Sequence, residues 1–370
     1  MPSTTPSPRP ATAQPDALDM PPTMRALTKH HAGPELRLQQ DRPRPDIGPR
    51  DVLIRVRKAG ICGTDRHIWQ WDDWAASRIP VGIVTGHEFA GVVAAVGGAV
   101  THFKPGDRVS AEGHITAGLD YNSRTGNAHI ARDTQILGVD RDGVFAEYVS
   151  VPEGNVWPIH PDIPDRIAAV FDPLGNAVHT VMEAGVSGQS VLISGVGIIG
   201  LMAVTVARAA GASTIFCTDV NPPRLDLARH LGADDAFDAR NGESWIDDVR
   251  RATRGEGADV LLEMSGAPAA MDQGFRSLRN GGTAALLGLP ARPVTFDFSS
   301  NIIFKGCKVL GINGRRMWET WYQMEEFVLS GRLNLDPVIT HEIPFEQYEE
   351  AFATMINGEG IKVLLDISSS

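Results

Sequence analysis

Residues 191–200 read Val-Leu-Ile-Ser-Gly-Val-Gly-Ile-Ile-Gly, and this stretch decides the fold of much of the chain. Its apolar start predicts a buried strand, its glycines a tight turn, and the apolar residues up to Ala210 a helix. The order Gly-x-Gly-x-x-Gly between a strand and a helix is typical of a dinucleotide-binding site. We expect Gly195 to make the turn, Gly197 to let the backbone approach a pyrophosphate, and Gly200 to allow close helix packing.

A carboxylate follows at the spacing that this site requires. Asp219 ends the next predicted strand, about 20 residues on, where it can hydrogen-bond the ribose hydroxyls. Because a carboxylate there repels a 2′-phosphate, the sequence favours NAD over NADP. Arg224 lies close by, either as a solvated helix residue or as a contact to the adenosine.

Strands and helices alternate from about residue 186 onward. The predicted strands are 191–193, 214–218, 260–263, 283–287 and 308–312, with helices after the glycine turn and over 222–231. Such alternation predicts a doubly wound parallel sheet in an α/β protein. Beyond residue 316 we expect helices at about 318–329 and 345–356 and a strand at 362–367.

The first half of the chain has a different pattern. Residues 24–178 are punctuated by Gly, Pro and Asp, contain predicted strands at 52–56 and 89–96, and show no periodic helix. Residues 1–23 are rich in Pro, Ser, Thr and Ala, which predicts a disordered tail, and Met24 is a candidate start. We therefore divide the chain into a tail (1–23), a β-rich catalytic domain (24–178), a nucleotide-binding domain (179–315) and a C-terminal segment (316–370) that packs back on the catalytic domain.

The composition narrows the class of protein. The 370 residues, 42% of them hydrophobic and 21% charged, suit a soluble globular protein of two domains. A formal net charge of −11 without a long basic block argues against nucleic acid or a membrane surface as a partner. The three cysteines, Cys62, Cys217 and Cys307, cannot form a disulfide scaffold, so we expect a cytoplasmic location.

Two short motifs supply candidate metal ligands. Residues 62–67 read Cys-Gly-Thr-Asp-Arg-His, and residues 86–88 read Gly-His-Glu. Thiolate, imidazole and carboxylate are ligands of catalytic zinc sites, which keep a fourth position open for substrate. We predict zinc on Cys62, His87 and Glu88. A small buried cysteine and a surface His-Glu pair are the plainer alternatives.

Thr64 and His67 extend this motif towards proton transfer. Zinc acidifies an alcohol, and the proton must then leave a dry site. A hydroxyl both donates and accepts, and imidazoles titrate near neutrality, so Thr64 can pass the proton to His67. Asp172 is a further candidate as metal ligand, as a base beside the ligands, or as a helix cap. Hydride transfer belongs to the nicotinamide ring.

Together these runs resemble the zinc-dependent medium-chain alcohol dehydrogenases, and within them most closely the L-threonine 3-dehydrogenases. The likeness covers nearly all of residues 24–367 and is strongest at 59–65, 106–116, 171–180, 262–268 and 319–322. It implies a GroES-like catalytic domain, a Rossmann domain and a homotetramer. The implied reaction is oxidation of the 3-hydroxyl of L-threonine by NAD, giving 2-amino-3-oxobutanoate.

The resemblance also implies roles for single residues. It implies the zinc ligands named above, a proton relay through Thr64 and His67, and an acidic helper at Asp172. The implied cofactor contacts are Ile199, Asp219, Arg224, Leu287, Gly288, Leu289, Ile312 and Asn313.

The chain departs from the family pattern at a second metal site. The family has a structural zinc on four cysteines, but the matching residues here are Ala117, Asp120, Ser123 and Ala131. None of them is a thiolate, so we predict one zinc per chain. The lobe at 113–134 must then be held by packing or by subunit contacts.

A second departure concerns the substrate. Asn313 and Arg316 stand where the family usually has Tyr and Glu. A guanidinium at Arg315 or Arg316 can pair with the carboxylate of threonine, and we expect His114 near the pocket. Surface solvation is the alternative for at least one arginine. Two hypotheses stay open: the same chemistry on another small alcohol (a polyol, a vicinal diol or another β-hydroxy amino acid), and a nucleotide-binding protein without catalysis.

Overall fold

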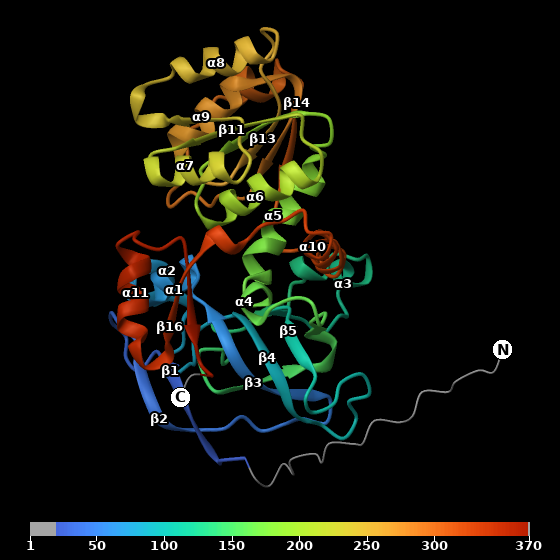
Figure 1. Cartoon of the computed structure of the whole chain (residues 1–370), viewed down its shortest axis with the longest axis vertical. Helices are drawn as coiled ribbons and strands as arrows, with labels where there is room; N and C mark the ends of the chain where they lie inside the picture. The colour runs from blue at the N-terminus through green and yellow to red at the C-terminus, as the bar shows by residue number, and fades with distance from the viewer. Residues whose placement is uncertain (1–19, 369–370) are drawn as a thin grey trace, which may run out of the picture.

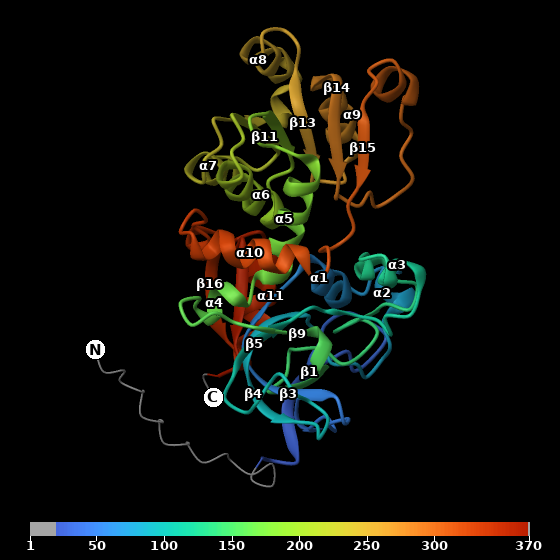
Figure 2. The same ribbon diagram turned by 90° about the vertical axis from the view of Figure 1, so that its right-hand side faces the viewer.

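The structure, a computed structural model, describes residues 20–368. It has two lobes, one built on a parallel sheet and one on a mainly antiparallel sheet, with helix α5 (Phe171–Ala184) running between them (Figures 1 and 2). Most of the predicted disordered tail lies outside the described residues. Strand β1 begins at Thr23, one residue earlier than the patterned sequence suggested.

The first lobe holds a six-stranded parallel sheet in the order β12-β11-β10-β13-β14-β15. This confirms the predicted doubly wound sheet. Its strands are β10 (Ser190–Ser194), β11 (Thr214–Asp219), β12 (Asp235–Asp238), β13 (Ala258–Glu263), β14 (Leu278–Leu286) and β15 (Lys308–Gly311). The helices around it are α6 (Ile198–Ala209), α7 (Pro222–His230), α8 (Ser244–Ala252) and α9 (Pro268–Ser277). The strand order reverses beside β10, which is where open α/β sheets bind their ligands.

The second lobe holds a seven-stranded sheet in the order β16-β17-β3-β4-β5-β9, with β8 paired to β3. Its strands are β3 (Asp51–Gly60), β4 (Glu88–Val96), β5 (Arg108–Ala111), β8 (Tyr148–Pro152), β9 (Val156–Pro158), β16 (Ile339–Pro344) and β17 (Lys362–Asp366). Two small ladders pair β1 (Thr23–Thr28) with β2 (Arg37–Pro43), and β6 (His114–Ile115) with β7 (Gln135–Ile136). Because β17 pairs with β3, the end of the chain is part of this sheet.

The first half of the chain contains helices, although its sequence shows no periodic helix. They are α1 (Gly63–Gln70), α2 (Asp73–Arg78), α3 (Tyr121–Arg124), α4 (Asp165–Ala168) and the start of α5. The first four are too short for a periodic pattern, and α5 buries ten of its 14 residues, so apolar and small residues dominate its sequence. Helices α10 (Glu319–Leu329) and α11 (Tyr348–Ile356) complete the chain.

One apolar core joins the two lobes. It contains the buried side chains of β10 and α6 together with those of α5 and, from the second lobe, Ala90 and Trp157. Helix α5 packs against α6 and α10, so it ties the glycine turn to the other lobe. Among the described residues, no helix is long and apolar enough to cross a membrane.

Candidate metal and dinucleotide site

The three predicted metal ligands lie together. The Cys62, His87 and Glu88 ligand atoms are all within 4.8 Å of one another. The pairing of β3 with β4 explains this, because Gly60 is opposite Glu88 and both loops leave the same end of the sheet. A side chain at Gly60 would collide with the Glu88 carboxylate, so only glycine fits beside the site.

The atoms in this cluster fit a zinc ion. His87 Nδ1 and Glu88 Oε1 are buried and have no hydrogen-bond partner, which is costly unless a ligand completes them. Burial alone lowers the pKa of His87, but the Cys62 thiolate and the carboxylates of Asp65 and Asp172 raise it to about 10. The surroundings therefore favour a positive charge at this place, and the donors are those of a catalytic zinc site.

Two groups that the sequence did not identify hold the ligands. The buried Lys362 ammonium, on β17, forms an ion pair with Glu88 Oε2 and donates to the Ile61 carbonyl oxygen at 2.8 Å. Asp65 is fully buried and accepts from the Cys62 backbone N–H at 2.9 Å, and burial raises its pKa to about 6. Lys362 therefore holds one oxygen of Glu88, and Asp65 orients the start of α1.

The predicted relay residues lead away from the cluster along α1. Thr64 Oγ1 lies 3.8 Å from Cys62 Sγ, and His67 is three residues further on, on the neighbouring turn. The His67 side chain is 54% exposed, and its Nδ1 lies 2.5 Å from Asp72 Oδ2. Asp72 also accepts from the Ala75 N–H as the N-cap of α2. The relay thus ends at an imidazole–carboxylate pair in contact with solvent.

Asp172 belongs to a buried group of charges. Its Oδ2 lies 2.6 Å from Arg315 Nη1, so it is engaged by a cation. The N-cap of α5 is Val170, without a side-chain cap, so the helix-cap interpretation of Asp172 is wrong. Arg315 also binds Glu112 with two nitrogens, and Glu112 accepts from Trp321 Nε1 at 2.9 Å.

The two arginines do not offer the free guanidinium that the sequence suggested. Arg315 is 2% exposed and is held by Glu112 and Asp172. Arg316 is partly exposed and shared between Glu183 at 3.2 Å and Glu319 at 3.5 Å. His114 lies beside this group, with its Nδ1 2.7 Å from Glu112 Oε1, and its place in a substrate pocket stays a prediction.

The glycine turn has the geometry of a phosphate-binding loop. Gly195 has φ of 89°, and a Cβ on Gly200 would collide with the Gly195 carbonyl oxygen, so both positions require glycine. Gly197 caps α6, and a Cβ there would meet no atom within 4 Å, which leaves open space at the helix N-terminus. Asp219 Oδ2 accepts the Val196 N–H at 2.8 Å, so this carboxylate also braces the loop.

The other predicted cofactor residues lie at the carboxyl ends of neighbouring strands. Leu287 and Gly288 donate their N–H groups to the Glu263 carbonyl oxygen, and the Ile312 N–H donates to that of Leu286 at 2.9 Å. Leu289 is 90% exposed, Ile199 lies in the first turn of α6, Arg224 lies in the first turn of α7, and Asn313 follows β15. The buried Glu263 carboxylate, which the sequence did not identify, accepts from the Ser265 and Gly266 N–H groups and fixes this wall.

Two aspartates hold the segment at 113–134, where the family has four cysteines. Asp120 caps α3 and accepts from the Arg132 N–H at 3.1 Å, while Asp133 accepts from Thr116 and from the Ala117 N–H. We expected packing or subunit contacts to hold this lobe, and hydrogen bonds within the chain also contribute.

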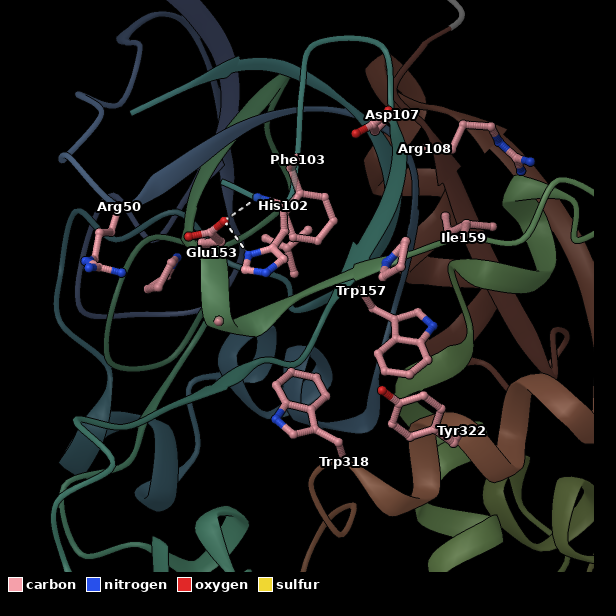
Figure 3. A pocket seen from close by; sticks show the side chains of 14 residues that line it. Arg50, His102, Phe103, Asp107, Arg108, Glu153, Trp157, Ile159, Trp318 and Tyr322 are labelled. Atoms are coloured by element: carbon pink, nitrogen blue, oxygen red, sulfur yellow. Dashed lines mark hydrogen bonds and ion pairs between the residues drawn. The ribbon is translucent and has the colours of Figure 1, made fainter. Parts of the chain in front are cut away.

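A groove of about 810 Å³ lies away from these residues. Figure 3 shows the rings of Trp157, Trp318 and Tyr322 gathered at one side of it, with a His102–Glu153 contact at the other. The residues that line it include none of the predicted metal, relay or cofactor residues.

Each of the two lobes matches a domain of known proteins. Residues 48–162 match the alcohol dehydrogenase GroES-like domain, and residues 199–330 match the zinc-binding dehydrogenase domain. Proteins named L-threonine 3-dehydrogenase from Symbiobacterium thermophilum and Burkholderia thailandensis are 48% and 47% identical, over 93% of this chain and 97% and 99% of theirs. A solved 2R,3R-butanediol dehydrogenase from Bacillus subtilis is 26% identical with a TM-score of 0.85, covering 93% of this chain and 99% of that one.

Proposed function

Because the chain belongs to the zinc-binding dehydrogenases with a GroES-like domain and is an oxidoreductase, we propose that it oxidises the 3-hydroxyl of L-threonine to 2-amino-3-oxobutanoate, with NAD. The observation that carries the proposal is the Cys62–His87–Glu88 cluster, whose buried His87 and Glu88 atoms lack partners. Relatives that carry this name match nearly the whole chain, which supports the substrate.

The chain holds the reacting groups and does not itself carry the redox chemistry. Bound zinc would act as a Lewis acid on the substrate hydroxyl, and NAD would accept the hydride. Cys62, His87 and Glu88 would hold the metal, while Lys362 keeps one Glu88 oxygen in place. One zinc per chain follows from the missing second set of cysteines.

Proton removal is the part that the side chains perform. The Thr64 hydroxyl accepts the substrate proton and passes it to His67, whose exposed ring releases it to water. Asp72 holds the His67 ring from its Nδ1 side. Asp172 acts as a nearby negative charge on His87 and not as a ligand, because Arg315 engages its carboxylate.

The nucleotide lobe binds NAD at the carboxyl ends of its strands. Gly195, Gly197 and Gly200 would leave room for the pyrophosphate, and the Asp219 carboxylate would hydrogen-bond the ribose hydroxyls and disfavour NADP. The remaining contacts are Ile199, Arg224, Leu287, Gly288, Leu289, Ile312 and Asn313. We further expect a homotetramer and a cytoplasmic location.

One observation favours a second candidate substrate. Arg315 is fully engaged and Arg316 is shared by two glutamates, so neither is free to bind a substrate carboxylate. A small secondary alcohol without a carboxylate, such as a vicinal diol, would not need that cation. The solved butanediol dehydrogenase shares this fold.

A substrate panel separates the two candidates. Purified protein is assayed for NAD reduction with L-threonine, L-serine, D-threonine, butanediol and polyols, and zinc is quantified in the same samples. Selective turnover of L-threonine supports the proposal. Turnover of a diol or polyol alone would identify that alcohol as the substrate instead. Absence of turnover in zinc-loaded protein across the panel contradicts both.

A further inference from the structure

A buried lysine lies at the end of the helix that carries the relay. Lys29 follows β1, and its side chain is completely buried. Its Nζ donates to the carbonyl oxygens of Ile68 at 2.8 Å and Glu35 at 3.0 Å, and it lies 4.7 Å from the centre of the Trp71 ring. Because the removal of an ammonium from water is costly, a lysine at this place calls for an explanation.

The contacts of Lys29 complete the C-terminus of α1. The last carbonyl groups of a helix have no partner inside it, and the negative end of the helix dipole favours a cation. The Ile68 carbonyl oxygen accepts from Lys29, and the next one, that of Trp69, accepts from the Glu35 N–H at 2.7 Å. Burial lowers the pKa of Lys29 to about 8, although the Glu35 carboxylate opposes this, so the ammonium is largely charged at pH 7.

The same lysine contacts two residues that have a left-handed backbone. Trp71 has φ of 55° and Glu35 has φ of 71°, values that residues other than glycine rarely adopt. Of the residues that the structure describes, Arg254 is the one other non-glycine residue with positive φ. Such conformations persist where their surroundings hold them, and Lys29 binds the ring of Trp71 and the carbonyl oxygen of Glu35. Lys29 therefore stabilises the left-handed turn that ends α1.

The turn at Trp71 determines where Asp72 lies. In a continuous helix, a residue five positions after His67 would point about 140° away from it around the axis. The left-handed Trp71 ends the helix instead, with its N–H donating to the His67 carbonyl oxygen at 2.9 Å. Asp72 Oδ2 then lies 2.5 Å from His67 Nδ1, and Asp72 caps α2, which lies beside α1 (Figure 2). The carboxylate of the relay thus depends on the turn that Lys29 holds.

We propose that Lys29 is a positioning residue for proton release, because it holds the left-handed turn at Trp71 and so keeps the Asp72 carboxylate against the His67 ring. The inference rests on the proposed function, in which His67 receives the proton of the alcohol. Lys29 acts through Asp72 and not on the substrate or the metal. Its substitution should therefore affect proton transfer and leave zinc content and KM nearly unchanged.

The first test compares two lysines that cap helices. Lys29→Met keeps the apolar part of the side chain and removes the cation. It should lower kcat about tenfold, as expected for the loss of Asp72, and added imidazole buffer should restore part of the turnover. Lys29→Arg, which keeps a cation, should retain more turnover than Lys29→Met.

The matched control is Lys305→Met in the nucleotide lobe. Lys305 Nζ donates to the Phe275 and Leu278 carbonyl oxygens at the end of α9, at 2.6 Å each. This variant should leave kcat unchanged with and without imidazole. A loss of kcat in Lys29→Met that imidazole does not restore, or an equal loss in Lys305→Met, would overturn the inference.

A double variant shows whether the lysine acts through the carboxylate. In the Asp72→Asn background the contact that Lys29 supports is already lost, so adding Lys29→Met should lower kcat by less than about twofold more. Independent effects would multiply to about a hundredfold, and that result would contradict the inference.

The Asp72 carboxyl reports its position without an assay of activity. Slight burial would raise its pKa, but the Ala75 N–H and the His67 ring hold that pKa below its usual range. In Lys29→Met, the pKa of Asp72 measured by carbon NMR should rise towards the ordinary value, and in Lys305→Met it should not. An unchanged pKa of Asp72 in Lys29→Met would overturn the inference.

A second variant covers the case in which Lys29→Met does not fold. Trp71→Leu keeps the ammonium and removes the ring beneath it. It should lower kcat about two- to fivefold, the contribution of one cation–π contact, with the same response to imidazole. Unchanged kcat in Trp71→Leu would then contradict the inference.

Failure of the proposed function gives a different pattern. Should the wild-type protein oxidise another alcohol and not L-threonine, the variants are assayed with that alcohol and the same outcomes apply. Should it oxidise no alcohol, the proposed function fails, and the NMR titration of Asp72 alone decides whether Lys29 positions this carboxylate.

Discussion

Two buried carboxylates show how differently one chemical group is used in this molecule. Glu112 and Glu88 are both fully buried, and each is paired with a buried cation, Arg315 or Lys362. Both Glu112 oxygens are satisfied, by Arg315, His114 and Trp321. Glu88 is held at one oxygen, and its other oxygen has no hydrogen-bond partner.

The difference separates architecture from chemistry. A satisfied carboxylate fixes the elements around it, because Glu112 connects β5 to the loop before α10 and to α10 itself. A carboxylate with a free lone pair, beside a thiolate and an unpartnered imidazole nitrogen, is prepared for a metal. Substitutions at the two sites should therefore affect different properties, activity and metal content in one case and stability in the other.

The largest expected effect is on turnover at the metal cluster. Cys62→Ser replaces the soft thiolate and should remove most of the bound zinc. Because the metal supplies several kcal/mol of stabilisation, turnover should fall on the order of 10³-fold. Cys307→Ser, at a half-buried cysteine outside the cluster, is the matched control. Full zinc content and normal turnover in Cys62→Ser would rule out the ligand assignment.

The next effect is on stability in the charge group. Arg315→Met leaves Glu112 and Asp172 buried without their cation, and should lower the free energy of unfolding by about 3 kcal/mol. Arg316→Met removes partly exposed ion pairs and should cost less than about 1 kcal/mol. Urea denaturation of the two variants measures the difference. Equal losses would contradict the distinction between the neighbouring arginines.

The same group of charges should make the free energy of unfolding depend on pH in the acid range. Although burial opposes it, the Arg315 guanidinium and the His114 contact hold the pKa of Glu112 well below 4.5. A depressed carboxylate pKa stabilises the fold above about pH 4.5, and this contribution is lost as the pH falls through the folded-state value. Glu112→Gln should thus be less stable than wild type by about 2 kcal/mol at pH 7, with a gap that narrows below pH 4.5. A gap that stays constant down to pH 3 would contradict this.

A smaller effect is expected at the end of the relay. Asp72→Asn keeps an N-cap for α2 but removes the charge beside His67. Turnover should fall about tenfold, below the full contribution of a general acid–base group, with KM nearly unchanged. Added imidazole buffer should restore part of it. Asp73→Asn, in the first turn of the same helix, is the control, and an equal loss there would show that Asp72 acts only through folding.

The smallest effect is a change in cofactor preference. Asp219→Gly, with Arg224 kept, should weaken the binding of NAD. The ratio of kcat/KM with NAD to kcat/KM with NADP should fall by about tenfold, the effect of one lost hydrogen bond to a charged group. Because Asp219 also binds the Val196 N–H, some loss with both cofactors is expected. An unchanged NAD to NADP ratio would contradict the ribose role.

Local signals allowed the nucleotide lobe and the cluster of candidate metal ligands to be predicted from the sequence. The glycine turn, Asp219 and the alternation of strands all lie in contiguous segments, so their local patterns correspond directly to the elements observed. Cys62, His87 and Glu88 lie beside glycines at strand ends, and the β3–β4 register brings them together.

Residues that act across long sequence separations could not be predicted. Lys362 is 274 positions from Glu88, and Arg315 is 203 positions from Glu112, so no local pattern marks either pair. The free-guanidinium interpretation of Arg315 was wrong for this reason. Asp72 could have been predicted, because an aspartate just before a helix and five residues after His67 is a recognisable cap.

The most direct test of the account is a zinc titration of metal-free protein. NADH formation from L-threonine is measured as zinc is added, with Glu88→Gln and Glu112→Gln in parallel. The account predicts activity that saturates at one zinc per chain, abolished binding in Glu88→Gln, and unchanged stoichiometry in Glu112→Gln. Full activity without zinc, or saturation only at two zinc ions per chain, would contradict it.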